Sequence, residues 1–470
     1  MKVGVIGAGP AGLSTAYLLS KNKINTTVFE KDNFVGGISR TIVKGEYRFD
    51  LGGHRFFSKN IEINQFLEEV VGDELIDVGR KSRIYFNKKY FDYPLTPKNA
   101  VFSLGIPTAI DILTSYITQR IKRIVLRKEI ITLEDWVTDK FGSKMFKLYF
   151  KSYTEKVWGI PCNKIEAEWV AQRIKGMSLS KAVKSAFTRA KSEGPATLLR
   201  EFMYPKLGIG RISERMTDSI LKSNNKVLLN SGITGINISD NKILSLKYCS
   251  EEGKRAAFEA DQFVSSMPIT ELLDCLNPSA PKEVINAAKQ LKFRDFIAVT
   301  LMLNKESVTD DTWLYIHEPN IQFGRIHEPK NWSSDMSPPG KTSLVMEYFC
   351  FEVDDIWKKP DSELIELTQN ELIEKLRFIS EDNILDSCVV RVKKAYPMYD
   401  LGYKKHLTVV LGYLNKFKNL HLIGRNGTFR YNNMDHSIEM GIKAARKILG
   451  SDEDIFSVNS SDEYLEEASD

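Results

Sequence analysis

Cysteine is scarce in this sequence of 470 residues, and its spacing argues against two kinds of site. The five cysteines form no C-x-x-C pair and no metal-ligand spacing: Cys162, Cys249, Cys275, Cys350 and Cys388. An odd, scattered set in a large protein is typical of a reducing compartment and not of a disulfide framework. We therefore expect a cytoplasmic protein without a metal site.

Long apolar runs and strong net charge are also lacking. No run reaches the about 18 uninterrupted apolar residues of a membrane-spanning helix. The net charge of +5 is small for this length, and no nucleic-acid signature is present. The segment 115–129, SYITQRIKRIVLRKE, is amphipathic and basic, which suits peripheral contact with anionic lipid, a solvated surface helix or a positive wall facing a phosphate. We expect no membrane span and no nucleic-acid partner, and the oligomeric state stays open.

The N-terminus carries a dinucleotide-binding pattern. Residues 2–6, KVGVI, predict a short buried strand. Gly7, Gly9 and Gly12 follow in G-x-G-x-x-G spacing before a helical pattern and a second strand that ends at Glu30. Gly7 suits the tight turn, and Gly9 lets the backbone approach a pyrophosphate. Gly12 lets helix and strand pack closely, and Glu30 can accept a hydrogen bond from a ribose hydroxyl. Because all parts occur in order within about thirty residues, the pattern is specific.

A second glycine pair favours FAD over NAD. The stretch EKDNFVGGISRT begins at Glu30 and places Gly36 and Gly37 beside the first turn, with Arg40 close behind. This stretch resembles the extended FAD fingerprint of the amine oxidase and glutathione reductase group. No second complete G-x-G-x-x-G pattern stands out, so NAD(P)H, if it serves as reductant, would visit the flavin transiently.

The pattern of elements predicts an α/β fold with several interleaved parts. Hydrophobic residues make up 42% of the chain, enough for a large core. We expect a Rossmann-like FAD-binding domain assembled from discontinuous segments, with a helical insert and an antiparallel-sheet substrate domain. The last nineteen residues contain eight acids and no base, which favours a disordered tail. The expected parts are FAD-binding (1–60, 201–285 and 413–450), mainly helical (61–200), strand-rich (286–412) and acidic tail (451–470).

Four further stretches resemble one enzyme family when taken together. They are FDLGGHRFFSK (49–59), YTEKVWGIPCNKIEAEWVAQRI (153–174), WLYIHEPNIQFGRIHEPKNWS (313–333) and GRNGTFRYNNMDH (424–436). In this order they resemble the UDP-galactopyranose mutases, FAD enzymes that interconvert the pyranose and furanose forms of UDP-galactose. More loosely, the chain is similar to the protoporphyrinogen oxidase and amine oxidase superfamily that contains them.

The resemblance implies catalytic and substrate-binding residues in the first three stretches. His54 matches a histidine that the GGH motif of the mutases places against the flavin ring, so it is expected to be catalytic and to contact the cofactor. Arg173 matches an arginine near the flavin and the sugar diphosphate, and Arg325 one that contacts the substrate pyrophosphate. Trp158 stands at the position of an active-site tryptophan. A lone arginine is more often part of a surface ion pair, but its guanidinium also matches two phosphate oxygens at once.

The last stretch implies further contacts at the C-terminal strand end. By resemblance, Gly424 and Arg425 lie against the flavin and its pyrophosphate, and Asp435 and His436 reach the ribityl chain or the pyrimidine edge. Tyr431 matches a tyrosine that binds the substrate diphosphate. A second such tyrosine is expected at Tyr396, with Tyr399 as the alternative, and a uridine contact at Tyr153, Phe323 or Trp332 stays open.

Three functions remain open at this point. In the mutases, reduced flavin N5 attacks the anomeric carbon of the UDP-sugar, which requires diphosphate-binding side chains and no side-chain acid/base pair. The alternative is an oxidoreductase that removes hydride from a sugar, an amine or another C–H substrate, because the fold alone does not decide the reaction. The third is a scaffold in which FAD is structural. Retention of a UDP-sugar by the reduced protein, consumption of an electron acceptor, or neither, distinguishes the three.

Overall fold

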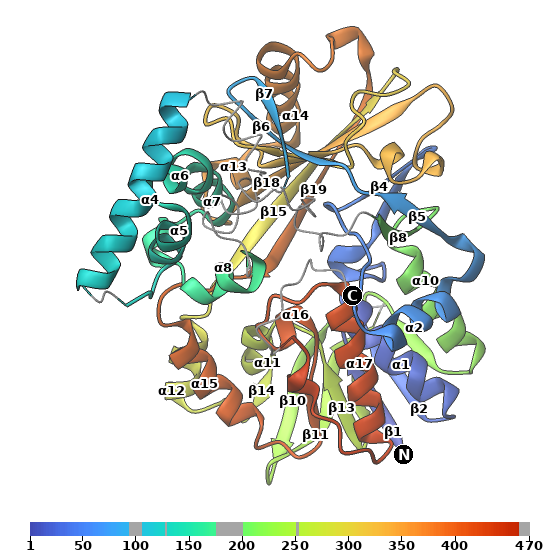
Figure 1. Ribbon diagram of the computed structural model, residues 1–470. Coiled ribbons are helices and arrows are strands. Elements are labelled where there is room, and N and C mark those ends of the chain that lie inside the picture. Colours follow the sequence, from blue (N-terminus) through green and yellow to red (C-terminus); the bar gives the residue numbers. More distant parts are fainter. Residues whose placement is uncertain (94–105, 127–128, 175–200, 251–252, 460–470) are drawn as a thin grey trace.

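The computed structural model describes residues 1–93, 106–126, 129–174, 201–250 and 253–459 (Figure 1). It is a mixed α/β structure, as predicted, with a parallel sheet in the lower part of Figure 1, a large antiparallel-rich sheet above it and a group of helices at one side. The side chain of Arg173 lies outside the described residues, although the helix that carries it is placed.

The parallel sheet has five strands that come from distant parts of the sequence. Its order is β20-β13-β1-β2-β9, and every neighbouring pair is parallel. Two helices, Pro10–Lys21 and Met434–Ile448, lie side by side against it. Gly441 allows their close approach, because a Cβ added at this position would lie 2.1 Å from Ser14 Oγ. The elements are β1 (Lys2–Ile6), α1 (Pro10–Lys21), β2 (Asn25–Phe29), β9 (Lys226–Leu228), β13 (Gln262–Ser265), β20 (Leu420–Leu422) and α17 (Met434–Ile448).

A four-stranded sheet and several helices extend this lower half. The sheet has the order β12-β11-β10-β14 and is antiparallel except for the pair β10–β14. The elements are β10 (Ile233–Ser239), β11 (Lys242–Cys249), β12 (Arg255–Glu259), β14 (Leu276–Asn277), α10 (Arg211–Lys222), α11 (Ile269–Asp274), α12 (Lys282–Ala288), α15 (Tyr403–Leu414) and α16 (Gly424–Gly427).

The upper sheet has seven strands in the order β19-β15-β18-β17-β16-β6-β7. Every residue of β15 and β18 is buried, as expected of central strands covered on both faces. The elements are β15 (Phe293–Leu303), β16 (Trp313–Ile316), β17 (Arg325–His327), β18 (Thr342–Cys350), α13 (Asp355–Lys358), α14 (Asp361–Asn370) and β19 (Ile384–Pro397).

Two strands of this sheet come from the region that the sequence analysis assigns to a mainly helical insert. The strands β6 (Ser82–Phe86) and β7 (Lys89–Asp92) form a hairpin, and β6 pairs in parallel with β16. The two-residue turn has Asn87 and Lys88 at φ +50° and +56°, the positive angles that a tight hairpin of this kind requires. This region therefore contributes two strands to the seven-stranded sheet in addition to its helices.

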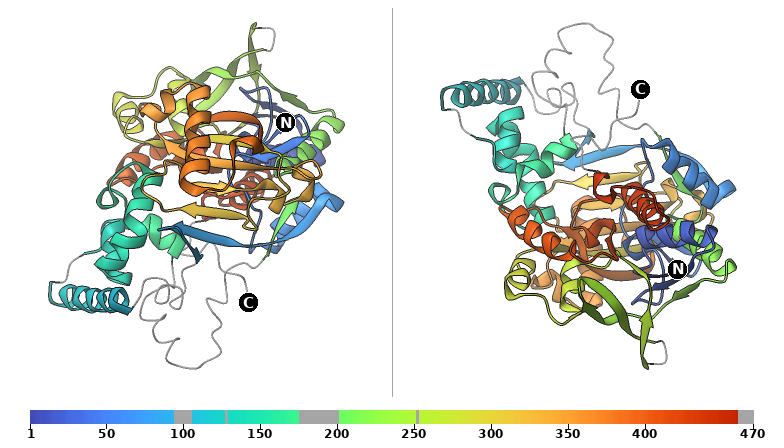
Figure 2. Two further views of the ribbon diagram at one scale, coloured as in Figure 1. Left: turned by 90° about the horizontal axis from the view of Figure 1, so that it is seen from above. Right: turned by 90° about the horizontal axis from the view of Figure 1, so that it is seen from below.

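The helices of the insert form a separate group. They are α4 (Ile106–Leu126), α5 (Leu133–Phe141), α6 (Ser143–Met145), α7 (Lys151–Trp158) and α8 (Ala167–Ile174), with a π-helical segment at Phe146–Phe150. Figure 2 shows α4 at the outer edge of the molecule. The remaining elements are the hairpin β3 (Thr41–Lys44) and β4 (Tyr47–Asp50), α2 (Ile61–Val71), and the pair β5 (Leu75–Gly79) and β8 (Glu201–Pro205). Among the described helices, none is both long and apolar enough to cross a bilayer.

The prediction of a disordered tail from residue 451 is wrong for its first part. Residues 451–459 are placed against the body of the protein, with Ile455 and Val458 buried. Arg430 Nη1 donates to the carbonyl oxygens of Phe456 and Val458 at 2.7 and 2.9 Å. Although the segment is acidic, it contains the apolar residues Ile455, Phe456 and Val458, which are enough to anchor it. Residues 460–470 lie outside the described part of the chain.

Candidate active site

A cavity of about 950 Å³ lies between the parallel sheet and the seven-stranded sheet, and it collects most of the predicted site. It is lined from both ends of the chain and from the three central motif stretches. The predicted site residues in its wall are Gly7, Gly9, Glu30, Gly36, Gly37, Arg40, His54, Trp158, Arg325, Tyr396, Gly424, Arg425, Tyr431 and Asp435.

The first glycine turn opens onto this cavity. Gly7 has φ +99°, and an added Cβ would lie 2.3 Å from Ser266 Oγ, so only glycine fits the turn. At Gly9, by contrast, an added Cβ would meet no atom within 4 Å, which means that open space lies in front of it. Gly9 also precedes α1 without a side-chain cap. A helix N-terminus with open space before it suits a pyrophosphate.

The second glycine turn and the acid of β2 complete this end of the cavity. Gly36 and Gly37 have φ +95° and +57°, and an added Cβ on Gly37 would lie 3.8 Å from Gly9 Cα. The Glu30 carboxylate accepts a hydrogen bond from the amide of Ala8 at 2.7 Å, and burial raises the pKa of Glu30. Arg40 donates to Gly37 O at 2.8 Å, while its buried Nε has no hydrogen-bond partner among the described residues. These groups fit a dinucleotide such as FAD.

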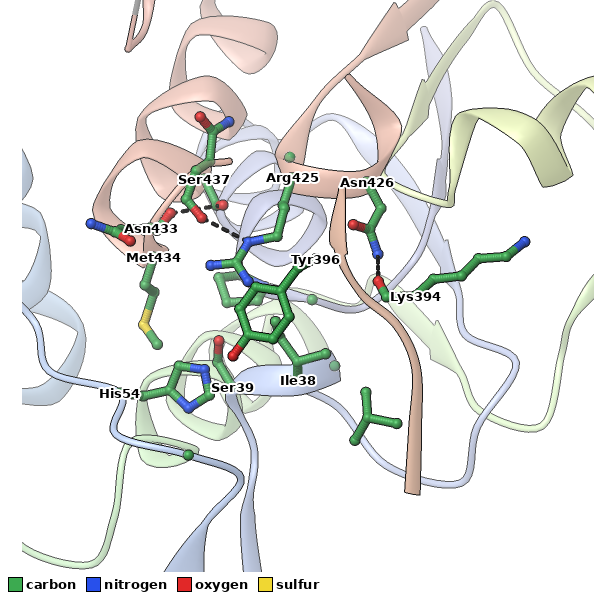
Figure 3. Close-up of a pocket in the computed structure, with 18 of the residues that line it drawn as sticks. Ile38, Ser39, His54, Lys394, Tyr396, Arg425, Asn426, Asn433, Met434 and Ser437 are labelled. Carbon is green, nitrogen blue, oxygen red and sulfur yellow. Dashed lines mark hydrogen bonds between the residues drawn. The ribbon is translucent and has the colours of Figure 1, made fainter. Parts of the chain in front are cut away.

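The C-terminal stretch lines the cavity next to the first glycine turn, since an added Cβ on Gly424 would lie 3.1 Å from Ala11 Cβ and 3.4 Å from Ser266 Cβ. The chain leaves β20 through the short helix α16 before α17 begins, so the last strand does not run straight into the last helix. Arg425 is fixed by its backbone contacts: Nε donates to Asn432 O at 2.8 Å and Nη1 to Ala395 O at 3.1 Å. Figure 3 shows its guanidinium beside the ring of Tyr396, and its central carbon lies 5.3 Å from that ring centroid.

His54 points into the same space as Tyr396 (Figure 3). Its Nδ1 is buried and has no hydrogen-bond partner in the described chain. Burial, reinforced by the positive charge of Arg425, lowers the pKa of His54 to about 3. The imidazole is therefore neutral near pH 7 and can offer one nitrogen to a bound ligand.

A buried ion pair that the sequence did not predict lies beside His54. Glu347, with 1% of its surface exposed, pairs with the guanidinium of Arg325, and its Oε1 lies 3.7 Å from His327 Nδ1. Burial acts to raise the pKa of Glu347, but Arg325, His327 and His54 together outweigh it and lower that pKa to about 2. The backbone of Gly52 lies directly against this carboxylate, since an added Cβ would be 3.5 Å from Oε2.

The predicted diphosphate contacts lie next to one another. Nη2 of Arg325 donates to the Tyr396 hydroxyl at 3.4 Å, and the Tyr396 ring stacks on Tyr431 with centroids 5.6 Å apart and planes 16° apart. Burial raises the pKa of Tyr396 to about 12, so its hydroxyl keeps its proton at neutral pH. Trp158 lies beside Tyr431, with ring centroids 6.3 Å apart.

Three predicted residues are not seen in the cavity wall. Gly12 packs α1 against the first turn, where an added Cβ would lie 2.0 Å from Gly7 O, in agreement with its predicted packing role. His436 caps α17, because its Nδ1 accepts a hydrogen bond from the amide of Asn433 at 3.2 Å. Arg173 is on α8, but its side chain lies outside the described residues.

Burial reduces the number of candidates for the uridine contact and for the second diphosphate tyrosine. Phe323 and Trp332 are 0% and 3% exposed and do not line the cavity, whereas Tyr153 does. Tyr399 is buried behind the wall, where its hydroxyl accepts the amide of Tyr431 at 2.9 Å. Of the two alternatives for the second diphosphate tyrosine, only Tyr396 lines the cavity.

Comparison with known proteins agrees with this architecture. The sequence profile of the family described as "Flavin containing amine oxidoreductase" matches residues 10–449. Protoporphyrinogen oxidase 2, chloroplastic/mitochondrial, of Arabidopsis thaliana is 35% identical over 69 residues, which are 15% of this chain and 14% of that protein. Coproporphyrinogen III oxidase of Staphylococcus aureus (strain NCTC 8325 / PS 47) is 30% identical over 110 residues, 23% of each chain. The matches thus span less than a quarter of these relatives.

A solved structure of reduced UDP-galactopyranose mutase is similar over nearly its whole length. Its TM-score with this chain is 0.82 at 21% sequence identity, covering 98% of this chain and 97% of that one. At that identity the likeness shows a shared fold alone. The family match over residues 10–449 is independent of it and implies a FAD cofactor, for which the glycine turns and Glu30 leave a fitting site. The predicted superfamily is thereby confirmed, and the chain belongs to the flavin-containing amine oxidoreductase family.

Proposed function

We propose that this flavoenzyme acts on a UDP-sugar and interconverts its pyranose and furanose forms, as a UDP-galactopyranose mutase does. The observation that carries the proposal is the cluster of Arg325, Tyr396 and Tyr431 in one wall of the cavity, which we call the diphosphate clamp. Its members come from three separate parts of the chain, yet one hydrogen bond and one ring stack join them.

The clamp has the chemistry that a diphosphate requires. Burial acts to lower the pKa of Arg325, but Glu347 and the neighbouring tyrosines Tyr396, Tyr153 and Tyr315 together hold that pKa well above its ordinary value, so the guanidinium keeps its positive charge. Its Nε is buried without a hydrogen-bond partner in the described chain, so a phosphate oxygen can accept from it. Tyr396 adds a protonated hydroxyl, and Arg425 lies 4.8 Å from the Tyr431 ring centroid as a second positive charge.

The cofactor would be held at the other end of the cavity. Gly7, Gly9 and the N-terminus of α1 suit its pyrophosphate, Glu30 its ribose, and Gly36 and Gly37 give the backbone a close approach. Reduced flavin supplies the nucleophile for the anomeric carbon. The protein itself then needs to hold the departing UDP and orient the sugar, and it needs no side-chain nucleophile.

His54 and the aromatic residues control the space between the two ends. A neutral His54 can hydrogen-bond a ligand without adding positive charge beside Arg325 and Arg425. Trp158 and Trp169 pack edge to face at 4.8 Å and line the cavity next to the clamp. These rings exclude water from a UDP group held by the clamp, so that it stays available for return to the sugar.

Net oxidation is the second candidate, and the matched relatives favour it because both are named as oxidases. An oxidoreductase would consume an electron acceptor with each turnover. A mutase begins and ends with the same flavin oxidation state. Measuring acceptor consumption therefore separates the two functions.

An anaerobic turnover assay tests the proposal. The flavin-loaded protein is reduced with dithionite, incubated with UDP-galactopyranose and analysed by chromatography. We expect a UDP-galactofuranose peak that requires reduced flavin and falls at least tenfold in Arg325→Lys, which keeps the charge but loses the planar fork. The matched control is Arg255→Lys, which alters an exposed arginine of β12 outside the cavity.

Two outcomes would contradict the mutase function. Unchanged UDP-galactose, despite bound and reducible flavin, would exclude this sugar as substrate. Consumption of oxygen or of an added quinone in proportion to product, in a parallel aerobic assay, would establish net oxidation instead.

A further inference from the structure

Helix α4 carries its apolar side chains on the side that faces away from the protein. Six large aliphatic residues of α4 are between 43% and 76% exposed: Ile110, Leu113, Ile117, Ile121, Ile124 and Val125. Ile110 to Ile124 recur every three or four residues and Val125 adjoins the last of them, so all six lie on one face of the helix, which we call the α4 stripe. In Figures 1 and 2 the helix lies at the outer edge of the molecule.

The opposite face of α4 holds the helix in place largely through polar contacts. Ser115 Oγ lies 2.9 Å from Ser143 Oγ, and Arg123 Nη1 donates to Asp139 Oδ2 at 2.5 Å. Ile112 is buried on this side. A surface helix of a soluble protein normally turns its apolar face to the core, so the orientation of α4 is inverted. The inverted orientation marks the α4 stripe as a surface for an apolar partner.

Positive charge accompanies the stripe. By helical spacing Arg120 and Lys122 border the stripe in the C-terminal half of α4, and both are exposed, whereas Arg123 lies on the opposite face with Asp139. Lys140 and Lys144, on the neighbouring helices, add two further cations near it. Asp139 forms ion pairs with Arg120, Arg123 and Lys140, and Asp111 pairs with Lys144, so two acids are shared among these cations and positive charge is left over. Basic side chains beside an apolar stripe match the headgroups and acyl chains of an anionic lipid surface.

We propose that α4 docks the protein on an anionic membrane surface, with its axis parallel to the membrane plane. The α4 stripe would enter the boundary between headgroups and acyl chains, and the flanking cations would contact lipid phosphates. The helix does not meet the requirements for a membrane span, which leaves the lying orientation. This docking surface is separate from the cavity chemistry, so it stands whether the enzyme is a mutase or an oxidase.

A second copy of the chain fits the α4 stripe less well. Parallel pairing of two α4 helices would bring their cationic halves together. Antiparallel pairing would place those cations opposite Asp111, the single acid of α4, which already pairs with Lys144 at 3.4 Å. An anionic bilayer offers an unlimited number of negative partners, and the charge therefore favours lipid.

Vesicle cosedimentation of the full-length flavin-loaded protein tests this proposal. We expect binding to vesicles of phosphatidylcholine with 30% phosphatidylglycerol, at least tenfold weaker binding to pure phosphatidylcholine, and weakening by added salt. Ile117→Ser with Ile121→Ser should reduce the partition coefficient at least tenfold. The matched control, Leu244→Ser with Val353→Ser, removes two exposed aliphatic side chains elsewhere, 51% and 73% exposed, and should bind as the parent does.

Circular dichroism and the flavin spectrum show whether each variant keeps its fold. Absence of vesicle binding by the parent would overturn the proposal, as would equal loss in the α4 variant and in the control. Sedimentation velocity provides the other test. A dimer that dissociates in the α4 variant, in a protein that does not bind vesicles, would assign the stripe to a second copy of the chain.

Discussion

Replacing Glu347 with glutamine should destabilise the protein, because it removes the charge that pairs with Arg325. Glu347 is 1% exposed, and its pKa lies at about 2 instead of the ordinary 4.5. A pKa lowered by that amount corresponds to about 3 kcal/mol of folding free energy at neutral pH. Breaking a buried pair on one side typically costs about 3–5 kcal/mol. We expect about 3 kcal/mol for Glu347→Gln, since Arg325 keeps 24% of its side chain exposed.

Equilibrium urea denaturation, with refolding checked, measures this loss. The matched control is Glu352→Gln, which breaks the exposed pair with Lys393 and should cost far less, because the two side chains are 44% and 62% exposed. The wild-type contribution of Glu347 is complete above pH 4.5 and is lost as the pH falls through about 2, because the unfolded carboxyl takes up a proton first. Glu347→Gln lacks that step. A loss no larger than that of Glu352→Gln would refute the buried pairing.

Three further predictions concern the cavity. Arg325→Lys should weaken UDP binding to the reduced protein about 10- to 100-fold by calorimetry, because a charged hydrogen bond contributes about 1.5–3 kcal/mol, and Arg255→Lys should leave binding unchanged. Gly9→Val should fold, since φ is −77° and its Cβ faces open space, but its flavin-to-protein absorbance ratio should fall at least tenfold. The pKa of His54 at about 3 predicts no titration of its ring between pH 5 and 8 by NMR, and its contribution to stability should fall as the pH drops from 6.5 toward 3.

The nucleotide-binding turns could be predicted from the sequence because their constraints are local. Gly7, Gly9 and Gly12 sit within six residues, and Glu30 follows one helix and one strand later. Each requirement concerns backbone shape or the distance to an adjacent strand, which short-range sequence determines. The structure places Gly7, Gly9 and Glu30 in the cavity wall and gives Gly12 its packing position.

Glu347 could not be predicted in the same way. It is the single acid in the mostly apolar stretch SLVMEYFCF, and nothing in this stretch indicates a partner for it. Its importance depends on the register between β17 and β18, which sets Arg325 directly opposite it. The two paired residues are 22 positions apart in the sequence. The turns between them set the register, and local propensity does not determine those turns. The hairpin β6–β7 could not be predicted for a related reason, since its pairing with β16 is non-local.

The acidic tail illustrates a limit of composition as a predictor. Eight acids in nineteen residues favour disorder on average, but Ile455 and Val458 fill space beside α17 and the backbone carbonyls of this segment bind Arg430. His436 illustrates a different limit, because a polar residue at a helix start serves equally well as a cap or as a ligand. The geometry of the helix end decides between these roles.

A crystal structure of the reduced protein with UDP tests the central claim most directly. The diphosphate clamp predicts electron density for the diphosphate within hydrogen-bond distance of Arg325 and of the Tyr396 and Tyr431 hydroxyls, with the uracil elsewhere in the same cavity. UDP bound away from these three residues, or absent at millimolar concentration from flavin-loaded crystals with an open cavity, would contradict the account.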